Sequence, residues 1–572
     1  MSKYPLPRLA RFLCLCGTVY LVSCQGVLPP VPESNPVPQK KTTGFGGVLM
    51  WKGDPSESGN YSSETTLTTS NVNPEQFGRI DSFQADGIIM AQPLYVASVD
   101  MGSSGAHDII IVATEHDSVY AIDADNPDQA PLWERHYVDP ANGITTMPDN
   151  FGGRTTVGGE IGITGTPFID ATTGAMYFVT ILEDNGTPQQ WLRAIDIRTG
   201  NDYGPGSVQI TASVPGDGKG SVNGQIPFDP AIHNNRMGLT EVNGAIIIGW
   251  SSFSDYGVYH GWLMAYDPST LKQLAVFNPT TQYQAVDAAN GIADHGGGGG
   301  FWQGGAAPAL DADGNIYLNT ADGSFNADQG GNNYGDTMLK LQFNGSSFQI
   351  ADWFTPFNAA CIDLDDIELG SGGVALLPTD FTNGVKLAMT HDKEGRMFLV
   401  NTDTMGHFNT SVDQIPQEFM VGQYTCSDTT QQSDADGPNW NRLYGTPSYW
   451  NGYVYSGASN LPLKQYKFEN GLLNPTPTDT SPSSYGYRGA NTVVSSNGTQ
   501  NGIVWASEKT PAGLGILHAY DANAISHELW NSNMVSERDA IGEGIGFAVP
   551  VIANGHVIVA NNKQINIFGL VQ

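Results

Sequence analysis

The chain has 572 residues and a formal net charge of −32, with 57 acidic against 25 basic residues. Such an acidic surface repels phosphate backbones, which makes nucleic acid a poor partner. Only 14% of the residues are charged, while glycine reaches 69 and proline 34, and this favours short strands and tight turns over helices. A chain of this length exceeds what one hydrophobic core normally fills, and a repeat architecture escapes that limit.

Residues 1–23 are expected to be an export signal. Lys3, Arg8 and Arg11 precede an apolar stretch, residues 12–21, that is too short to span a membrane. The tetrapeptide LVSC at residues 21–24 resembles the lipobox of bacterial lipoproteins, which implies cleavage before Cys24 and lipidation of that cysteine. The alternative is an ordinary signal peptide that happens to contain a cysteine.

Residues 24–45 are expected to hold the lipidated cysteine and a tether. The segment is rich in proline and lacks periodic apolar residues, so it is expected to be extended over a length on the order of 50 Å. Gln25 follows the cysteine and, by the same resemblance, favours sorting to the outer membrane. We therefore expect an exported protein, anchored to the outer membrane and located in the periplasm or at the cell surface.

Residues 46–572 carry a loosely repeated unit of three or four short strands. Its clearest copy is QPLYVAS, DIIIVATEHD, SVYAIDAD and PLWERHY, between residues 92 and 137. Alternating apolar residues with turns at these spacings predict an all-β fold, a single β-propeller of four-stranded antiparallel blades. Eight blades are predicted, because first strands open near Gln92, Gly165, Met237, Ala306, Gly372, Gly445, Asn491 and Phe547.

The last predicted blade contains only three obvious strands. An early strand, FGRIDSFQAD at residues 77–86, precedes the first full blade and is expected to supply the missing outer strand. Closing the ring in this way leaves no exposed sheet edge at either end of the array. We expect a closed ring and a monomer.

Some blades carry part of the repeat Ala-x-Asp-x-x-Thr-Gly-x-x-x-Trp. The sequence AID at 121–123 is followed by Trp133, and AYD at 519–521 is followed by Trp530. These motifs resemble those of pyrroloquinoline-quinone (PQQ) repeat propellers, in which tryptophans dock between blades. Three longer segments, at 246–267, 301–326 and 354–403, resemble the quinoprotein alcohol dehydrogenases in order and spacing.

The resemblance implies a set of site residues. It places metal ligands at Asp255 and Asp322, with Asp365 as a further candidate. Oxygen ligands of this kind suit calcium or a lanthanide. It also places the catalytic base at Asp363, and an ionised aspartate suits proton abstraction from an alcohol.

Two further residues are implied as contacts of the quinone. Lys393 falls on the lysine of the family that touches the cofactor, where a cation stabilises the reduced form. Trp302 lies near, but displaced from, the tryptophan beneath the cofactor, and the position itself is close to Pro308. The adjacent cysteine pair of the family is absent, and the chain has no C-x-x-C-H motif for covalent haem.

Two functions follow from these observations. In the favoured one, the propeller is a ligand-binding or partner-binding scaffold, because the ring-stacking groups of the family are missing. In the alternative, it is a dehydrogenase for an alcohol or sugar that depends on PQQ and calcium. The expected partners are a membrane, through the lipid anchor, and a protein or a small alcohol or sugar. Whether Cys361 and Cys426 pair is left open.

Overall fold

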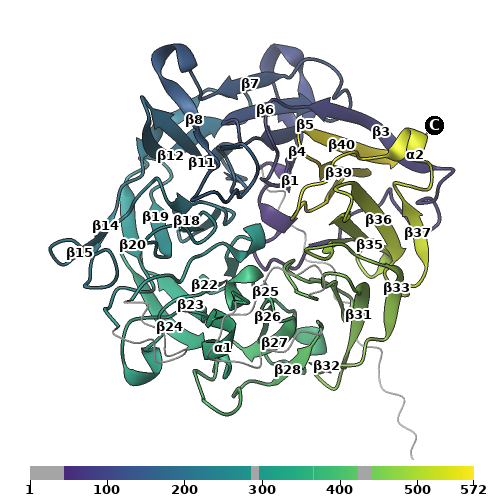
Figure 1. Ribbon diagram of the computed structural model, residues 1–572. Coiled ribbons are helices and arrows are strands. Elements are labelled where there is room, and N and C mark those ends of the chain that lie inside the picture. The colour runs from purple at the N-terminus through teal and green to yellow at the C-terminus, as the bar shows by residue number, and fades with distance from the viewer. Residues whose placement is uncertain (1–43, 285–295, 365, 423–440, 572) are drawn as a thin grey trace, which may run out of the picture. The chain divides into compact units, whose positions relative to one another are not determined.

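The computed structural model describes residues 44–284, 296–364, 366–422 and 441–571. From Gly44 onward these residues form one compact unit, a ring of eight β-blades (Figure 1), which confirms the predicted propeller and its blade number. Cys24, Asp365 and Cys426 lie outside the described residues, so the predictions made for them stay predictions. Within the described ranges, no helix is long and apolar enough to cross a membrane.

The first four blades each contain four antiparallel strands in chain order. Blade 1 consists of β4 (Leu94–Asp100), β5 (Ala106–Ala113), β6 (Ser118–Asp123) and β7 (Trp133–His136); blade 2 of β10 (Phe168–Ile169), β11 (Ala175–Asp184), β12 (Thr187–Asp196) and β13 (Asp202–Gln209); blade 3 of β17 (Thr240–Val242), β18 (Ala245–Ser252), β19 (Trp262–Tyr266) and β20 (Gln273–Phe277); blade 4 of β21 (Ala309–Leu310), β22 (Asn315–Asn319), β23 (Met338–Phe343) and β24 (Phe348–Phe354).

The last four blades repeat this pattern. Blade 5 consists of β25 (Ala375–Leu376), β26 (Leu387–His391), β27 (Arg396–Asn401) and β28 (Gln417–Met420); blade 6 of β29 (Ser448–Trp450), β30 (Tyr453–Ser456), β31 (Pro462–Glu469) and β33 (Asp479–Ser484); blade 7 of β34 (Asn491–Asn497), β35 (Gln500–Lys509), β36 (Gly515–Asp521) and β37 (Glu528–Asn531); blade 8 of β38 (Val551–Ala553), β39 (His556–Ala560), β40 (Gln564–Leu570) and β3 (Phe77–Gln84).

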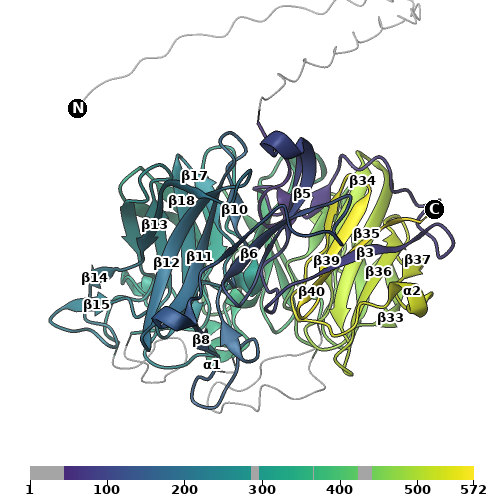
Figure 2. The same ribbon diagram turned by 90° about the horizontal axis from the view of Figure 1, so that it is seen from above.

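Additional elements decorate the ring. Figure 2 shows the blades from the side, with α1 and β8 at one face and the β14–β15 hairpin projecting outward. Their bounds are β8 (Ile144–Pro148), β9 (Glu160–Ile161), β14 (Ser213–Pro215), β15 (Gln225–Pro227), β16 (His233–Asn234), β32 (Leu472–Leu473), α1 (Ala359–Leu364) and α2 (Ser536–Asp539).

The ring closes as predicted. Strand β3 pairs antiparallel with β40, with Phe77 opposite Leu570 and Gln84 opposite Gln564. Phe77 is fully buried, and its ring lies 5.0 Å from that of Trp530 on blade 7. The outer strand of blade 8 therefore comes from the start of the propeller, and this pairing satisfies the edge of the last blade.

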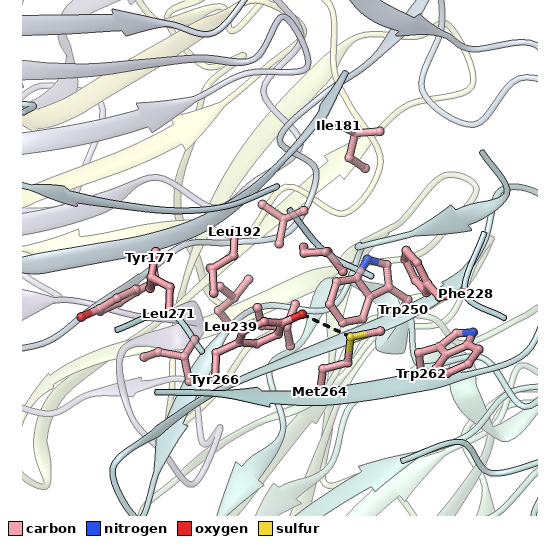
Figure 3. Packing of buried hydrophobic residues seen from close by; sticks show 14 of the residues in the cluster. Tyr177, Ile181, Leu192, Phe228, Leu239, Trp250, Trp262, Met264, Tyr266 and Leu271 are labelled. Carbon is pink, nitrogen blue, oxygen red and sulfur yellow. Dashed lines mark hydrogen bonds between the residues drawn. The ribbon is translucent and has the colours of Figure 1, made fainter. Parts of the chain in front are cut away.

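The hydrophobic core lies between neighbouring blades. Figure 3 shows the packing of blade 2 on blade 3, where Tyr177 and Leu192 face Trp250 and Met264. The tryptophan of the repeat motif also joins neighbouring blades, because Trp133 of blade 1 donates its indole N–H to the carbonyl of Ile197, 2.7 Å away and just after β12. Each blade therefore buries its apolar faces against its neighbours, as repeat architectures require.

Residues 45–64 form a plug inside the ring, with β1 (Gly46–Val48), a short 3₁₀ turn (Trp51–Gly53) and β2 (Asn60–Tyr61). Strand β1 pairs with β4 of blade 1, and β2 pairs parallel with β34 of blade 7. Between them, carbonyl groups of residues 49–59 accept hydrogen bonds from the first strands of blades 2, 4, 5, 6 and 7. The sequence analysis assigned this stretch to the propeller without predicting its central path, which appears in purple in Figure 1.

Candidate functional site

A cavity of about 530 Å³ opens directly beside the plug. Its walls include Met90 and Tyr444. Each lies two residues before a residue, Gln92 or Thr446, that accepts a hydrogen bond from Lys52 of the plug. The Lys52 backbone N–H donates to Gln92 Oε1 (2.9 Å), and its ammonium donates to the carbonyl of Thr446 (2.6 Å). The two hydrogen bonds of Lys52 therefore join the plug to the segments that carry these wall residues.

The cavity is basic although the chain is strongly acidic. Its lining contains the acidic side chains of Asp255, Asp366 and Glu368. Against these three it contains five of the 25 basic residues of the chain, namely Arg154, Arg236, Lys393, Arg442 and Arg488. A concentration of cations on a protein of net charge −32 indicates a site for an anionic ligand.

Arg236 illustrates how these cations are held. The side chain is 6% exposed, and its guanidinium donates to the carbonyls of Met90 (3.3 Å), Thr164 (3.2 Å) and Gly304 (3.2 Å). Burial lowers its pKa to about 10, so it remains charged at neutral pH. The groups that it bonds are neutral carbonyls, and this leaves its charge to act on a ligand in the cavity.

A lysine bridges two carboxylates in the same wall. The Lys393 ammonium lies 2.6 Å from Asp366 Oδ1 and 2.6 Å from Glu368 Oε2. Burial opposes the charge on Lys393, but the two carboxylates outweigh it and raise the pKa of the ammonium. Burial likewise favours protonated Asp366, yet the Lys393 charge prevails and lowers the pKa of that carboxyl.

Trp302 joins this group. Its indole N–H donates to Glu368 Oε1 at 3.0 Å, and the Lys393 ammonium lies 5.5 Å from the centre of its ring. The ring also meets Phe547 edge-on, with centroids 5.8 Å apart. An aromatic face, a cation and a carboxylate are thereby fixed relative to one another in the cavity wall.

Asp322 lies behind this wall, in the turn that follows β22. One of its oxygens lies within 4.8 Å of ligand atoms from both Asp366 and Glu368. Asp322 also belongs to a second group of the same dimensions, formed with Asp336 and Asp363. Burial and the charges of Glu368 and Asp336 raise the pKa of Asp322 well above its usual value.

Asp255 approaches from blade 3, in the turn after β18. Its carboxylate accepts hydrogen bonds from the hydroxyls of Tyr259 (3.1 Å) and Ser252 (3.3 Å). The residue is open to the cavity, but the crowded walls reduce its hydration and, together with the charge of Asp366, raise the pKa of its carboxyl. The tyrosine links this aspartate to the Asp322 group, because the charges of both act on Tyr259.

The structure thus brings together the residues implied by the resemblance. Asp255, Trp302 and Lys393 line the cavity, and Asp322 contacts the carboxylates of its wall. Asp363, the implied base, lies on α1 and accepts a hydrogen bond from the Gly323 N–H at 2.8 Å. It is placed with Asp322 and Asp336, whereas Asp366 and Glu368 face the cavity.

Several of these residues escaped sequence reasoning. Asp366 and Glu368 follow the Asp363-Leu364-Asp365 motif directly and were not singled out, and Asp336 lies in an ordinary turn before β23. The arginines left a usable signal, because Arg236 lies one residue, and Arg442 and Arg488 each three residues, before a predicted blade opening, the position of a loop near the propeller axis.

Cys361 of α1 is disulfide-bonded. The sequence analysis left its pairing with Cys426 open, and Cys426 lies outside the described residues.

Comparison with known proteins identifies the fold. A quinohemoprotein alcohol dehydrogenase from Comamonas testosteroni has a TM-score of 0.58 at 14% identity, over 91% of this chain and 80% of its own. A second one from Pseudomonas putida HK5 has a TM-score of 0.56 at 16% identity, over 92% and 80%.

A europium-containing methanol dehydrogenase has a TM-score of 0.56 at 13% identity, over 92% of this chain and 98% of its own. No family model and no curated protein matches the sequence. At these identities the likeness shows the fold alone, and it confirms the predicted resemblance to quinoprotein-type propellers.

Proposed function

We propose that this protein is a dehydrogenase that binds a hard metal cation and an anionic quinone of the PQQ type in its central cavity, where it oxidises an alcohol or sugar. One observation carries the proposal. Five basic side chains, an aromatic ring and a group of carboxylates, drawn from six separate blades or the loops before them, converge on one cavity at the channel mouth. This geometry favours the dehydrogenase over the scaffold that the sequence analysis preferred.

The carboxylates fit a cation. Oxygens of Asp322, Asp366 and Glu368 lie within 4.8 Å of one another, and two oxygens bound to one calcium ion are at most about 5 Å apart. Within the described part of the chain, Asp322 Oδ1 is buried and has no hydrogen-bond partner. An oxygen-only donor set with an unsatisfied atom suits calcium or a lanthanide better than a softer metal.

The basic side chains of the cavity fit an anionic cofactor. Arg236, Arg442 and Arg488 offer guanidinium groups that bind carboxylates in two-point contacts. Trp302 offers an aromatic face, and Phe547 lies edge-on to it and 4.6 Å beneath the Arg488 guanidinium. A bound quinone would supply the two-electron acceptor that the side chains of the protein do not provide.

Asp366 is the side chain best placed to take the proton of a substrate hydroxyl. Its side chain is 38% exposed and lines the cavity, and the Lys393 ammonium keeps it ionised. An ionised carboxylate within reach of a hydroxyl is what general-base catalysis requires. Asp363 remains the alternative that the resemblance implies, although it lies behind the wall.

The first experiment titrates the purified full chain with PQQ in the presence of calcium and follows tryptophan fluorescence. We expect saturable quenching that EDTA weakens at least tenfold, together with dye reduction when a small alcohol is added. If PQQ leaves the fluorescence unchanged at every calcium concentration, the dehydrogenase proposal fails and the scaffold function remains.

The second experiment identifies the base. At saturating PQQ and calcium, which offset the loss of one cation ligand, Asp366→Asn should lower turnover by a factor on the order of 10²–10⁴. Asp363→Asn is the matched comparison on the same segment, and it should change turnover less. The reverse order would assign the base to Asp363.

The export signal and the lipid anchor on Cys24 are also proposals, supported by the sequence motif alone. Cys24→Ala should release the protein from the membrane fraction into the soluble fraction of cells that express the full chain. Retention in the membrane fraction would contradict the anchor.

A further inference from the structure

A second group of carboxylates shares Asp322 with the set proposed to hold the cation in the cavity wall. Ligand oxygens of Asp322, Asp336 and Asp363 all lie within 4.8 Å of one another. They come from three separate places in the chain: the turn after β22, the turn before β23 and the helix α1. A single ion bound to oxygens at 2.3–2.6 Å spans such a group without rearrangement.

Asp336 has an oxygen that the protein leaves unsatisfied. The residue is 1% exposed, and its Oδ1 accepts a hydrogen bond from the Leu369 N–H at 2.9 Å. Its Oδ2 is buried without a hydrogen-bond partner among the described residues. A buried carboxylate oxygen with no partner carries a desolvation penalty that a bound cation would remove.

The charges around this oxygen do not compensate it. The strongest charge interactions of Asp336 are with Asp363, Glu368 and Asp392, which are all acidic. Lys393 is the nearby ammonium, but its contacts at 2.6 Å are with Asp366 and Glu368 in the cavity wall. Asp336 therefore lies among acidic charges, while the lysine contacts Asp366 and Glu368.

The backbone around the group prevents the carboxylates from moving apart. The Gly323 N–H holds Asp363 Oδ1 at 2.8 Å. A Cβ atom on Gly335 would lie 2.0 Å from the Gly323 carbonyl oxygen, and one on Gly298, at a φ of +76°, would lie 2.4 Å from the Asp322 carbonyl oxygen. Three backbone segments are packed this closely only because glycines occupy the contacts.

We infer that Asp322, Asp336 and Asp363 form a second cation site, which shares Asp322 with the site of Asp322, Asp366 and Glu368 at the cavity wall. Asp322 has two carboxylate oxygens and bridges the two ions, one oxygen to each. The oxygen-only ligands select a hard cation, calcium or a trivalent lanthanide. The deep ion is structural, because it ties α1 to blade 4 beneath the cofactor cavity.

The test counts ions on the full chain without any cofactor, so that its outcome is independent of the proposed dehydrogenase activity. EDTA-treated protein is dialysed against calcium chloride or, separately, lanthanum chloride, and the metal bound per chain is measured. We expect two ions on the wild-type protein, one on Asp336→Asn and one on Glu368→Gln. Asp363→Asn should also bind one, and serves if Asp336→Asn does not fold.

Asp117 provides the matched control. Like Asp336 it is fully buried, with one oxygen that accepts a backbone N–H (from Ile181, 3.3 Å) and one without a partner in the described structure. It lies at the start of β6, in neither carboxylate group. Asp117→Asn should therefore still bind two ions. One ion on the wild type, or two on both Asp336→Asn and Asp363→Asn, would overturn the second site.

Discussion

Two groups of buried charges in this propeller differ in how they are balanced. On blade 7, His518 lies between two acids, with Nδ1 2.7 Å from Glu528 Oε1 and Nε2 3.4 Å from Glu508 Oε1. The His518 side chain is 6% exposed, and those of Glu508 and Glu528 are 8% and 14% exposed. Burial opposes a charge on the imidazole, but the two glutamates prevail and raise the pKa of His518.

At the cavity wall, two overlapping groups of carboxylates lie beside one ammonium. These are Asp322, Asp336, Asp363, Asp366 and Glu368, with Lys393 as the cation that contacts two of them. On blade 7 both acids contact one imidazole, whereas the Lys393 ammonium contacts two of the five cavity carboxylates and Asp336 Oδ2 is buried without a hydrogen-bond partner among the described residues. A buried charge whose partner is in the chain serves the fold, whereas a crowded carboxylate group with an unsatisfied oxygen indicates a ligand that completes the site.

The largest expected effect comes from removing the ammonium that contacts two carboxylates of the cavity wall. Lys393→Met removes the ammonium that contacts both Asp366 and Glu368, so we expect the free energy of unfolding to fall by about 3 kcal/mol in EDTA. Calcium should recover most of this loss, because the ion replaces the ammonium. Urea unfolding with and without calcium measures both values.

Lys464→Met is the control for this variant. The Lys464 ammonium donates to the carbonyl of Val421 at 2.6 Å, and this acceptor is neutral. The decrease in the free energy of unfolding caused by Lys464→Met should therefore be the same with and without calcium. If Lys393→Met lowers the free energy of unfolding equally in EDTA and in calcium, no ion replaces the ammonium. The cavity carboxylates would then need no ligand, like the acids of blade 7.

The next effect concerns blade 7 and depends on pH. Because the pKa of His518 is raised in the folded protein, its charge stabilises the fold fully below the unfolded pKa of about 6.5, and this stability is lost as pH rises through the folded value. His518→Gln should cost about 2 kcal/mol at about pH 6 and much less at high pH. Thermal midpoints over this range, with calcium and with EDTA, should agree. A calcium-dependent difference would contradict the structural role of blade 7.

The smallest effect tests whether the cavity acids repel one another without metal. Burial and neighbouring acids raise the pKa of Asp336 well above its usual value, so the stability that it contributes is present below its unfolded pKa and lost as pH rises. Asp336→Asn should remove this decline and make the metal-free protein more stable by about 1 kcal/mol at alkaline pH. Thermal midpoints in EDTA between about pH 5 and about pH 9 measure the slope. If the thermal midpoint of Asp336→Asn falls with pH as steeply as that of the wild type, Asp336 is not the cause of the decrease.

Local sequence predicted the blades because each blade is a local unit. Alternating apolar residues and turns lie within one stretch of chain, and the strand at 77–86 was recognised as an outer strand because it had no blade of its own. The path of residues 45–64 could not be predicted in this way. Its hydrogen bonds go to strands as distant as Val494, and the segment WKGDPSESGNY shows no alternation.

The site was predictable only where a motif marked it. Asp255, Asp322 and Lys393 stand in segments that resemble a known family, and the structure brings them to one place. Asp336 has no such mark, and its importance depends on burial and on neighbours that lie far away in the sequence. The position of Asp366 rather than Asp363 in the cavity wall depends on how α1 ends, which spacing alone does not determine.

The plug has a mechanical consequence for the whole molecule. Residues 45–64 bond to the first strands of blades 1, 2, 4, 5, 6 and 7, and the Glu64 carboxylate accepts the Gly555 N–H of blade 8 at 2.9 Å. A force applied at residue 44 is therefore distributed over hydrogen bonds to seven blades. If the protein is tethered through its leading residues, detaching the plug therefore requires breaking contacts with several blades, not with one.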